Sequence, residues 1–297
     1  MLRVEPDFYK DFKCIADKCR HSCCLGWEID IDEDSLRRFL AVDGEFGGYI
    51  RRNIDLEPTP HFTLTEDERC PFLRPDGLCK MILTLGEDAI CDICREHPRF
   101  YNELPGRIEA GLGLCCEEVC RLLTKNDAHL GFVSHGKDEG EEDRLITLRE
   151  EIYAVLREDE LCLTERMEKA LALFDMPLMP FEAKKLKGLY MGLERLDEDW
   201  TKKLELLRPV ELEPELSRMR YVRLAEYFIY RHFATAPDEY EAALRLQFAF
   251  LSTRLICALD KLCDDNESTR LYSSEIEYSD ENMDLILDYI DENIPVF

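Results

Sequence analysis

The sequence predicts a mainly α-helical protein: a cysteine-rich metal-binding N-terminal region with short helices and loops, followed by an all-α helical region. Eleven of the fourteen cysteines lie before residue 121. Beyond residue 144, apolar residues recur at the three- and four-residue spacing of amphipathic helices. Residues 125–143 are polar and glycine-bearing, so we expect a cysteine-rich domain over 1–124, a linker over 125–143 and a helical domain over 144–297.

The clustered cysteines are the candidate metal ligands. The N-terminus lacks the pattern of a signal peptide, and no run of 18 apolar residues predicts a membrane span, so we expect a cytoplasmic protein. In a reducing cytosol, such clusters more often bind metal than form disulfides. The candidate ligands are Cys14, Cys19, Cys23, Cys24, Cys70, Cys79, Cys91, Cys94, Cys115, Cys116 and Cys120.

Short elements are expected around these cysteines. Alternating apolar and acidic residues over 28–34 predict a short strand, and Asp32 or Asp34 is placed to cap a following helix. The turn signal Pro75-Asp76-Gly77 would bring Cys70 and Cys79 together, and a helix is expected over 80–86. Cys91-Asp-Ile-Cys94 has the C-x2-C spacing of two thiolates on one ion. In a helix beginning after Gly113, Cys116 and Cys120 would share a face.

The residues leave the identity of the metal open. Zinc accepts four cysteine or histidine ligands and iron–sulfur clusters prefer four thiolates, so either fits an all-thiolate site, and eleven thiols permit one site or two. Cys19 and Cys23 begin the C-x3-C-x2-C signature of radical adenosylmethionine enzymes, but Gly26 stands at its third position. The glycines of Gly111-Leu-Gly113 follow a segment that we interpret as a poor strand, which argues against a dinucleotide-type fold.

The C-terminal half is expected to be helical almost throughout. Its apolar stripes include one helix over about 181–205 and a long stripe from Leu244 to Leu262. A packed aromatic face is the favoured interpretation of the remaining group, ahead of a pocket: Tyr221, Tyr227, Tyr230 and His232. Three further cysteines are expected to be buried in helices: Cys162, Cys257 and Cys263.

The net charge is −26. A polyanion would be repelled by such a chain, so we expect no nucleic-acid partner. The same surface suits a basic or lysine-bearing partner, and solubility alone also explains acidity of this kind.

The cysteine motifs resemble a known family. Cys19-Arg-His-Ser-Cys23-Cys24, Cys70-Pro-Phe-Leu and Cys94-Arg-Glu-His-Pro98 resemble the CxxCxxCC family of zinc or iron chelators. With Leu-Gly-Trp27-Glu-Ile-Asp-Ile and Gly111-Leu-Gly-Leu-Cys115-Cys116-Glu-Glu, the chain is more similar to flagellin lysine-N-methylases of the FliB type. The motifs cover about residues 5–123.

The resemblance implies methyl transfer from S-adenosylmethionine to lysines of flagellin. It also implies an iron–sulfur cluster held by cysteines, of the 4Fe–4S type, with zinc as the alternative metal. It assigns neither a catalytic base nor residues that bind the methyl donor. Two other hypotheses stay open: a non-enzymatic metal-binding or electron-transfer module with a helical docking domain, and a disulfide-stapled protein.

Overall fold

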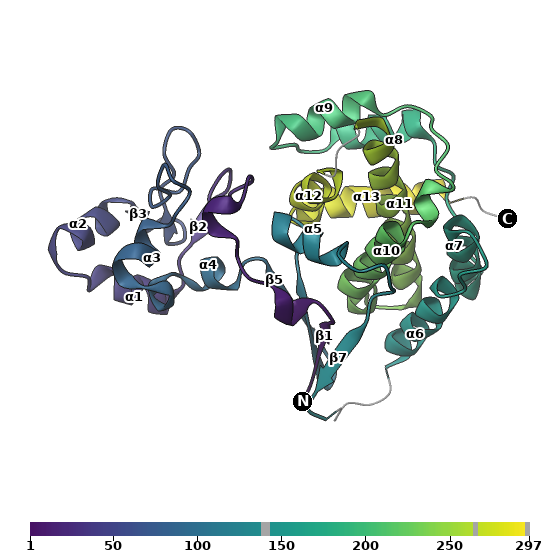
Figure 1. The fold of residues 1–297 in the computed structure, drawn as a ribbon, viewed down its shortest axis with the longest axis horizontal. Coiled ribbons are helices and arrows are strands. Elements are labelled where there is room, and N and C mark those ends of the chain that lie inside the picture. Colours follow the sequence, from purple (N-terminus) through teal and green to yellow (C-terminus); the bar gives the residue numbers. More distant parts are fainter. Residues whose placement is uncertain (138–142, 264–266, 295–297) are drawn as a thin grey trace. The chain divides into compact units, whose positions relative to one another are not determined.

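A computed structural model describes residues 1–137, 143–263 and 267–294, which pack into two compact units (Figure 1). The larger unit comprises residues 1–12, 101–115 and 119–297, and the smaller unit comprises residues 13–100 and 116–118. This division into compact units differs from the ranges expected from the sequence, which are 1–124, 125–143 and 144–297. Those ranges stay a prediction of the domain boundaries. Residues 138–142 of the expected linker lie outside the described residues.

A four-stranded sheet forms one part of the larger unit. Its order is β5-β6-β1-β7, with β1 (Leu2–Pro6) parallel to β6 (Arg107–Leu112) and antiparallel to β7 (Phe132–His135). β5 (Arg99–Leu104) and β6 are joined by a turn in which Gly106 has φ +76°. The interpretation of the segment before Gly111 as a poor strand was therefore wrong. Pro105-Gly106 is the turn of a hairpin, and polar residues alternate along its half-exposed strand β5.

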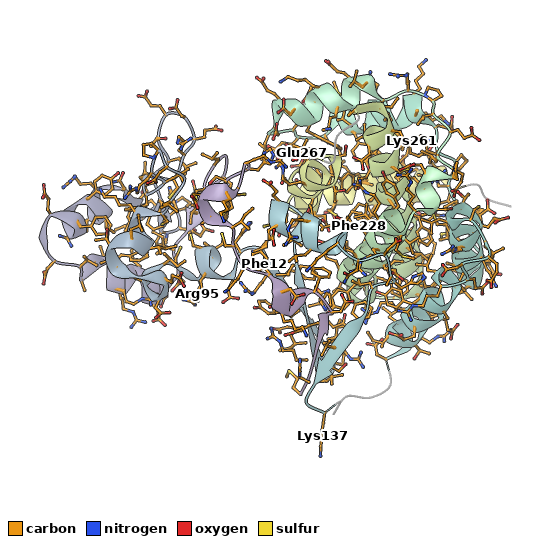
Figure 2. The ribbon with its side chains drawn as sticks, viewed as in Figure 1. Phe12, Arg95, Lys137, Phe228, Lys261 and Glu267 are labelled. Atoms are coloured by element: carbon orange, nitrogen blue, oxygen red, sulfur yellow. The ribbon has the colours of Figure 1, made fainter. Side chains whose placement is uncertain are left out.

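Helices make up most of the rest of this unit, which confirms a mainly α-helical protein. The buried centre is formed by α10 and by the 25-residue helix α11, and Figure 2 shows the Phe228 side chain of α10 among these helices. By length and composition α11 would also pass as a membrane span, but 94% of its most apolar window is buried inside the protein, as in a core helix. The helices are α5 (Glu117–Leu123), α6 (Arg144–Leu156), α7 (Leu163–Leu171), α8 (Ala183–Gly192), α9 (Glu198–Leu206), α10 (Met219–His232), α11 (Glu239–Cys263), α12 (Ser268–Tyr272) and α13 (Asp280–Asn293).

The single helix expected over 181–205 is two helices, α8 and α9. The chain turns at Leu193, which has extended backbone angles, and Asp197 then caps α9 by accepting a hydrogen bond from the Asp199 amide. A short polar side chain such as Asp197 can cap the start of a second helix. The apolar pattern of the sequence continues through this break, so the pattern alone predicts one helix.

Buried charges connect the sheet to the helices of the larger unit. Arg149 of α6 donates two hydrogen bonds, of 2.7 and 2.5 Å, to the carboxylate of Glu109 on β6, and the Glu109 side chain is fully buried. The Tyr230 hydroxyl of α10 lies 2.9 Å from the Val4 carbonyl and 3.1 Å from the Ala110 carbonyl on neighbouring strands, which share its one donated proton. Because a buried charge left without its partner is costly, these contacts fix where the helices lie on the sheet.

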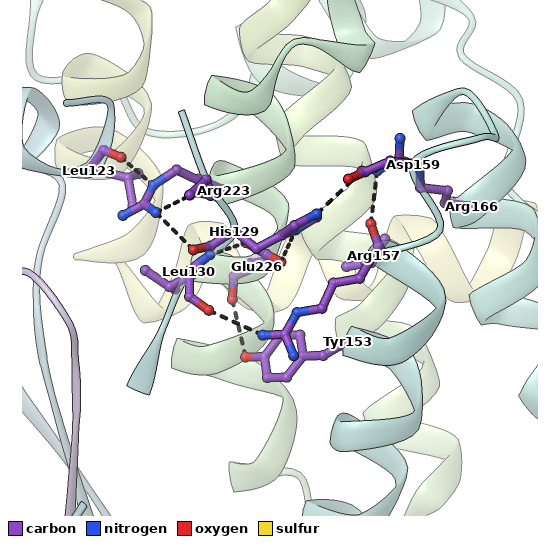
Figure 3. Close-up of polar contacts among 11 residues, drawn as sticks. Leu123, His129, Leu130, Tyr153, Arg157, Asp159, Arg166, Arg223 and Glu226 are labelled. Atoms are coloured by element: carbon purple, nitrogen blue, oxygen red, sulfur yellow. Dashed lines mark hydrogen bonds and ion pairs between the residues drawn. The ribbon is translucent and has the colours of Figure 1, made fainter. Parts of the chain in front are cut away.

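A second polar network holds the segment that follows α5 (Figure 3). The buried carboxylate of Glu226 accepts hydrogen bonds from the Leu130 amide at 2.7 Å and contacts Nδ1 of His129 at 2.8 Å. Nε2 of His129 lies 3.3 Å from Asp159, which also pairs with Arg166 at 2.9 Å. The chain from α5 to β7 is therefore tied to α10 by side chains rather than by apolar packing alone.

The smaller unit contains short elements around a small apolar core. They are β2 (Ile29–Asp30), α1 (Glu33–Leu40), α2 (Gly44–Arg52), β3 (Ile54–Asp55), β4 (His61–Phe62), α3 (Lys80–Leu85) and α4 (Asp92–Glu96). The three strands pair in the order β2-β4-β3, and Phe39, Phe62 and Phe72 form the aromatic centre. The expected strand near residue 29, the Asp32 cap and the helix after Cys79 are confirmed.

We predict that His129 makes the larger unit less stable at alkaline pH. The hydrogen bond with Glu226 raises the pKa of His129 above its usual value of 6.5. The contribution of charged His129 to the free energy of unfolding is therefore complete below pH 6.5, and it is lost as the pH rises through the higher pKa of the folded state. His129→Gln should lower the free energy of unfolding in urea by about 1–2 kcal/mol at pH 6 and by less at pH 9.

The matched control is His135→Gln, which removes an exposed histidine of β7 in the same unit and should change neither value. An equal loss at both pH values in His129→Gln would contradict the role of the charged imidazole.

Candidate metal centre

Nine of the eleven candidate ligands belong to the smaller unit. These are Cys14, Cys19, Cys23, Cys24, Cys70, Cys79, Cys91, Cys94 and Cys116, whereas Cys115 and Cys120 belong to the larger unit. The boundary between the units thus falls between the adjacent residues Cys115 and Cys116.

A hairpin brings Cys70 and Cys79 together, as the turn signal predicted. The Arg74 amide donates to the Leu78 carbonyl at 3.0 Å, and Gly77 occupies the left-handed region with φ +78°, where a side chain would be strained. Leu73 and Cys79 form a bridge across the base of this hairpin. The Cys70 amide then donates to the Cys24 carbonyl at 2.9 Å, so the first cysteine segment is held beside the hairpin.

Cys91 and Cys94 are positioned by α4 and by Asp32. Cys91 directly precedes α4 and Cys94 lies within it. One oxygen of Asp32 caps α1 by accepting from the Ser35 amide at 2.8 Å, and the other accepts from the Asp92 amide at 2.9 Å. Burial opposes ionisation of this carboxyl, but the two amide donors lower the pKa of Asp32 to about 2. A permanently charged aspartate therefore joins the starts of both helices.

Five of these thiols, which we call the inner thiols, are part of the apolar core of the smaller unit. Cys70 and Cys91 are buried in it, and the other three pack against it. Cys70 lies close enough to Cys24, Cys79 and Cys91 for their charges to interact, and Cys94 interacts with Cys24 and Cys70. The inner thiols are Cys24, Cys70, Cys79, Cys91 and Cys94.

Backbone amides lower the pKa of three of the inner thiols. The Phe72 amide acts on Cys70, the amides of Met81 and Ile82 act on Cys79, and the Cys94 amide acts on Cys91. Such donors stabilise the thiolate form and surround the sulfur ligands of iron–sulfur clusters.

The inner thiols differ in how readily they lose a proton. Burial raises the pKa of Cys70 to about 12 and raises that of Cys79. The hydrogen bond between Cys91 and Cys94 lowers the pKa of Cys91 and raises that of Cys94. A metal ion that bound here would have to displace several protons, as is usual for thiolate ligands.

The remaining cysteines of the smaller unit are more exposed. Cys14 and Cys23 are exposed, and Cys19 and Cys116 are half-buried. The Cys19 sulfur lies 3.8 Å from Glu117, whose carboxylate accepts two hydrogen bonds of 2.9 Å from Arg20. Cys14 lies close enough to both Cys19 and Cys23 for their charges to interact, and Cys116 does so with Cys23, so we call these four thiols the outer group. A hydrogen bond between Cys23 and Cys24 joins the outer group to the inner thiols.

Cys115 and Cys120 have partners within the larger unit. The Cys120 sulfur lies 3.0 Å from the Leu114 carbonyl, and Cys115 forms a hydrogen bond with Tyr278. Cys116 directly precedes α5 and Cys120 lies within it.

The donor chemistry fits a thiolate-bound metal, but the thiols are not drawn into a closed coordination shell. Within residues 1–137, 143–263 and 267–294, no three side chains of histidine, cysteine, aspartate or glutamate have the arrangement of a metal site. The inner thiols supply the ligand type and the amide donors, and their role as ligands stays a prediction.

The larger unit contains a buried polar cluster that the sequence did not indicate. Glu277, in the π-helical turn Ser273–Glu277, has a fully buried side chain that lies 2.8 Å from Nε2 of His232 and 3.4 Å from Nε of Arg231. Burial works against the charge of Glu277, yet Arg231 lowers its pKa, and burial lowers the pKa of His232. The Tyr227 hydroxyl accepts a hydrogen bond from Arg231 at 2.9 Å. His232 and Tyr227 therefore lie in a packed face, as expected, but one that contains an ion pair.

The sequence pattern did not indicate Glu277 and Arg231 for a simple reason. Both residues are charged, and charged residues in helices normally face solvent. The one available signal was Ser273-Ser-Glu-Ile-Glu277, a polar stretch that interrupts an apolar helical pattern. π-helical turns occur frequently at functional sites.

Comparisons with known proteins place the chain in a family. The flagellar biosynthetic protein FliU of Salmonella muenchen is 31% identical over 133 residues, which are 42% of this chain and 79% of FliU. Lysine-N-methylases of Salmonella choleraesuis (strain SC-B67) and Salmonella typhimurium (strain LT2) are also 31% identical over 133 residues, which are 33% of their length. No family model and no solved structure matches the chain.

Fold and site define a cysteine-rich, mainly α-helical protein with nine of its fourteen cysteines in a small unit. The chain belongs to the family that contains FliU and these lysine-N-methylases, which confirms the resemblance to the FliB type. The match spans about a third of the length of the lysine-N-methylases.

We predict a large difference in reactivity between Cys14 and Cys70. In the reduced, metal-free protein at pH 8, iodoacetamide should modify Cys14 at least tenfold faster, because Cys14 is exposed whereas burial raises the pKa of Cys70 to about 12. Peptide mass spectrometry over a time course measures both rates. Equal rates would show that the core around Cys70 opens readily, in conflict with the packing described above.

Proposed function

We propose that this chain takes part in the methylation of lysine side chains on flagellin, with S-adenosylmethionine as methyl donor. The observation that carries the proposal is membership of the family of FliU and the lysine-N-methylases. The names of those relatives concern flagellar biosynthesis and lysine N-methylation, and the net charge of −26 suits a substrate that presents lysines.

The proposed reaction sets clear chemical requirements. The lysine nitrogen must lose a proton before it attacks, and the carbon–sulfur bond of the sulfonium breaks as the nitrogen–carbon bond forms. The products are a methylated amine, S-adenosylhomocysteine and the released proton. A protein catalyses such a step by holding the methyl group in line with the nitrogen and by accepting the proton.

We further propose that the inner thiols hold an iron–sulfur cluster of the 4Fe–4S type or, as the alternative, a zinc ion. Four of them suffice for either centre, and the fifth would remain a packed thiol. A bound metal would offset the mutual repulsion of neighbouring thiolates and would link the first cysteine segment, the hairpin and α4. The outer group supplies candidate ligands for a second site within the smaller unit, and the roles of Cys115 and Cys120 as ligands stay a prediction.

A second candidate function is a metal-binding or electron-transfer module without methyltransferase activity. The match to only a third of each lysine-N-methylase favours it, because the rest of those proteins has no counterpart in the comparison. A cytoplasmic location is common to both proposals.

Methyl transfer is tested directly with the protein purified without oxygen. Incubation with flagellin and S-adenosylmethionine labelled in its methyl group should yield label on flagellin lysines, located by mass spectrometry. Acetylated flagellin is the control and should take up no label. Transfer that fails with the metal fully loaded would favour the metal-binding module, particularly if calorimetry detects no S-adenosylmethionine binding.

Single cysteine substitutions test the metal centre. Cys70→Ala and Cys91→Ala should each lose more than half of the bound metal, because each removes a buried ligand of the inner group. Cys162→Ala is the matched control, since Cys162 lies at the start of α7 in the larger unit, and it should keep the wild-type metal content.

Elemental analysis and the absorption spectrum measure that content. Unchanged metal in both inner variants would shift the assignment to the outer group, and wild-type protein purified without any metal would refute the centre.

A further inference from the structure

An aromatic pair lies beside the inner thiols in the smaller unit. Trp27 packs against the apolar core that contains Cys24, Cys79 and Cys94, yet its side chain is only half-buried. The rings of Trp27 and His97 lie 6.2 Å apart between centroids, with their planes inclined by 31°. The two rings thus lie close together, Trp27 packs against the thiol-containing core, and both residues remain partly accessible to solvent.

The backbone around Trp27 is firmly held. Its indole Nε1 donates a hydrogen bond of 2.7 Å to the Cys23 carbonyl, which fixes the plane of the ring. Gly26 has φ +78°, and its amide donates to the Glu68 carbonyl at 2.9 Å. Leu25 and Arg69 form a bridge on the same side. The orientation of Trp27 is therefore set by the chain itself and needs no ligand to form.

His97 is also fixed, but its ring nitrogens are not used. The His97 amide donates to the Ile93 carbonyl at 3.1 Å at the end of α4. Within the part of the chain that the structure describes, neither ring nitrogen of His97 forms a hydrogen bond to another residue. Burial lowers the pKa of His97, so the ring is neutral at neutral pH and does not repel a positive charge.

The net negative charge of the smaller unit favours cations. The smaller unit carries more acidic than basic side chains, and the exposed Glu28 follows Trp27 in the chain. A cation is attracted to the face of a tryptophan when it lies within roughly 6 Å of the ring centroid, and one ion can satisfy that distance to both rings here. Tryptophan is the strongest of the aromatic side chains in this interaction.

We propose that Trp27 and His97 form a binding site for a cationic group, either the ammonium of a substrate lysine or the sulfonium of the methyl donor. The two sources share one chemistry, a compact positive charge with attached methyl or methylene groups. The inference rests on the proposed methylation only for the identity of these two ligands. It places cation recognition on the same small unit as the thiols.

Paired ligands that differ in charge test the site. Calorimetry with the full-length protein would compare N-acetyl-lysine methylamide with its neutral norleucine analogue, and S-adenosylmethionine with the neutral thioether S-adenosylhomocysteine. At least one pair should show a threefold or greater preference for the cation, an order of magnitude consistent with a cation–π contact. The pair that shows it identifies the source of the charge.

Two variants locate the effect. Trp27→Leu should abolish the preference, and Trp27→Phe, which keeps an aromatic face, should retain part of it. Because Trp200 is fully buried, a cation-dependent change in tryptophan emission of the wild-type protein should come from Trp27. The emission measurement on the wild-type protein tests the site even if the Trp27→Leu variant does not fold.

The outcomes separate this inference from the proposed function. Equal affinity for charged and neutral ligands, or a preference that survives Trp27→Leu, would overturn the cation site even if flagellin is methylated. A preference that depends on Trp27 would support the site even if no methyl group is transferred.

Discussion

The structure of the smaller unit depends on a small apolar core in which thiols are packed beside aliphatic and aromatic side chains. Its strands are two residues long and α4 has five residues, so local hydrogen bonding contributes little to its stability. Cys70 and Cys91 occupy buried positions that aliphatic side chains fill in ordinary cores, and Cys24, Cys79 and Cys94 pack around them. A core of this size is marginal, and small units of this kind usually gain stability from a metal or from disulfides. The proposed centre and the fold of this unit are therefore linked physically.

The larger unit is organised differently, by charged side chains that are buried around α10. Arg223 is fully buried and donates hydrogen bonds to the carbonyls of Leu123 and Ala128, both at 2.6 Å. Glu226 accepts from the following segment, and Arg231 pairs with Glu277. Removing one partner of a buried ion pair typically costs 3–5 kcal/mol, whereas replacing the whole pair by apolar groups can be neutral. Such pairs therefore contribute to the uniqueness of the packing more than to its overall stability.

The sequence predicted the features that depend on local patterns. The hairpin between Cys70 and Cys79 follows from Pro75-Asp76-Gly77, and the helical half follows from apolar periodicity. It did not predict the pairing of β1 with β6, because this contact joins residues about a hundred positions apart and their strands lack clear alternation. Nor did it predict that Cys115 and Cys116 would belong to different units, since adjacent residues carry no local signal of where each packs.

That division separates the members of the third cysteine cluster. Cys115 interacts with Tyr278 and Cys120 with the Leu114 carbonyl, both within the larger unit, whereas Cys116 belongs with the outer group of the smaller unit. Leu114 also donates its amide to the Tyr227 hydroxyl, which is part of the cluster around Arg231 and Glu277. The peptide bond between Cys115 and Cys116 therefore connects a buried ion-pair cluster to the thiol-bearing unit. The residues that precede Cys116 are held by hydrogen bonds within the larger unit, so of this cluster only Cys116 is grouped with the thiols of the smaller unit.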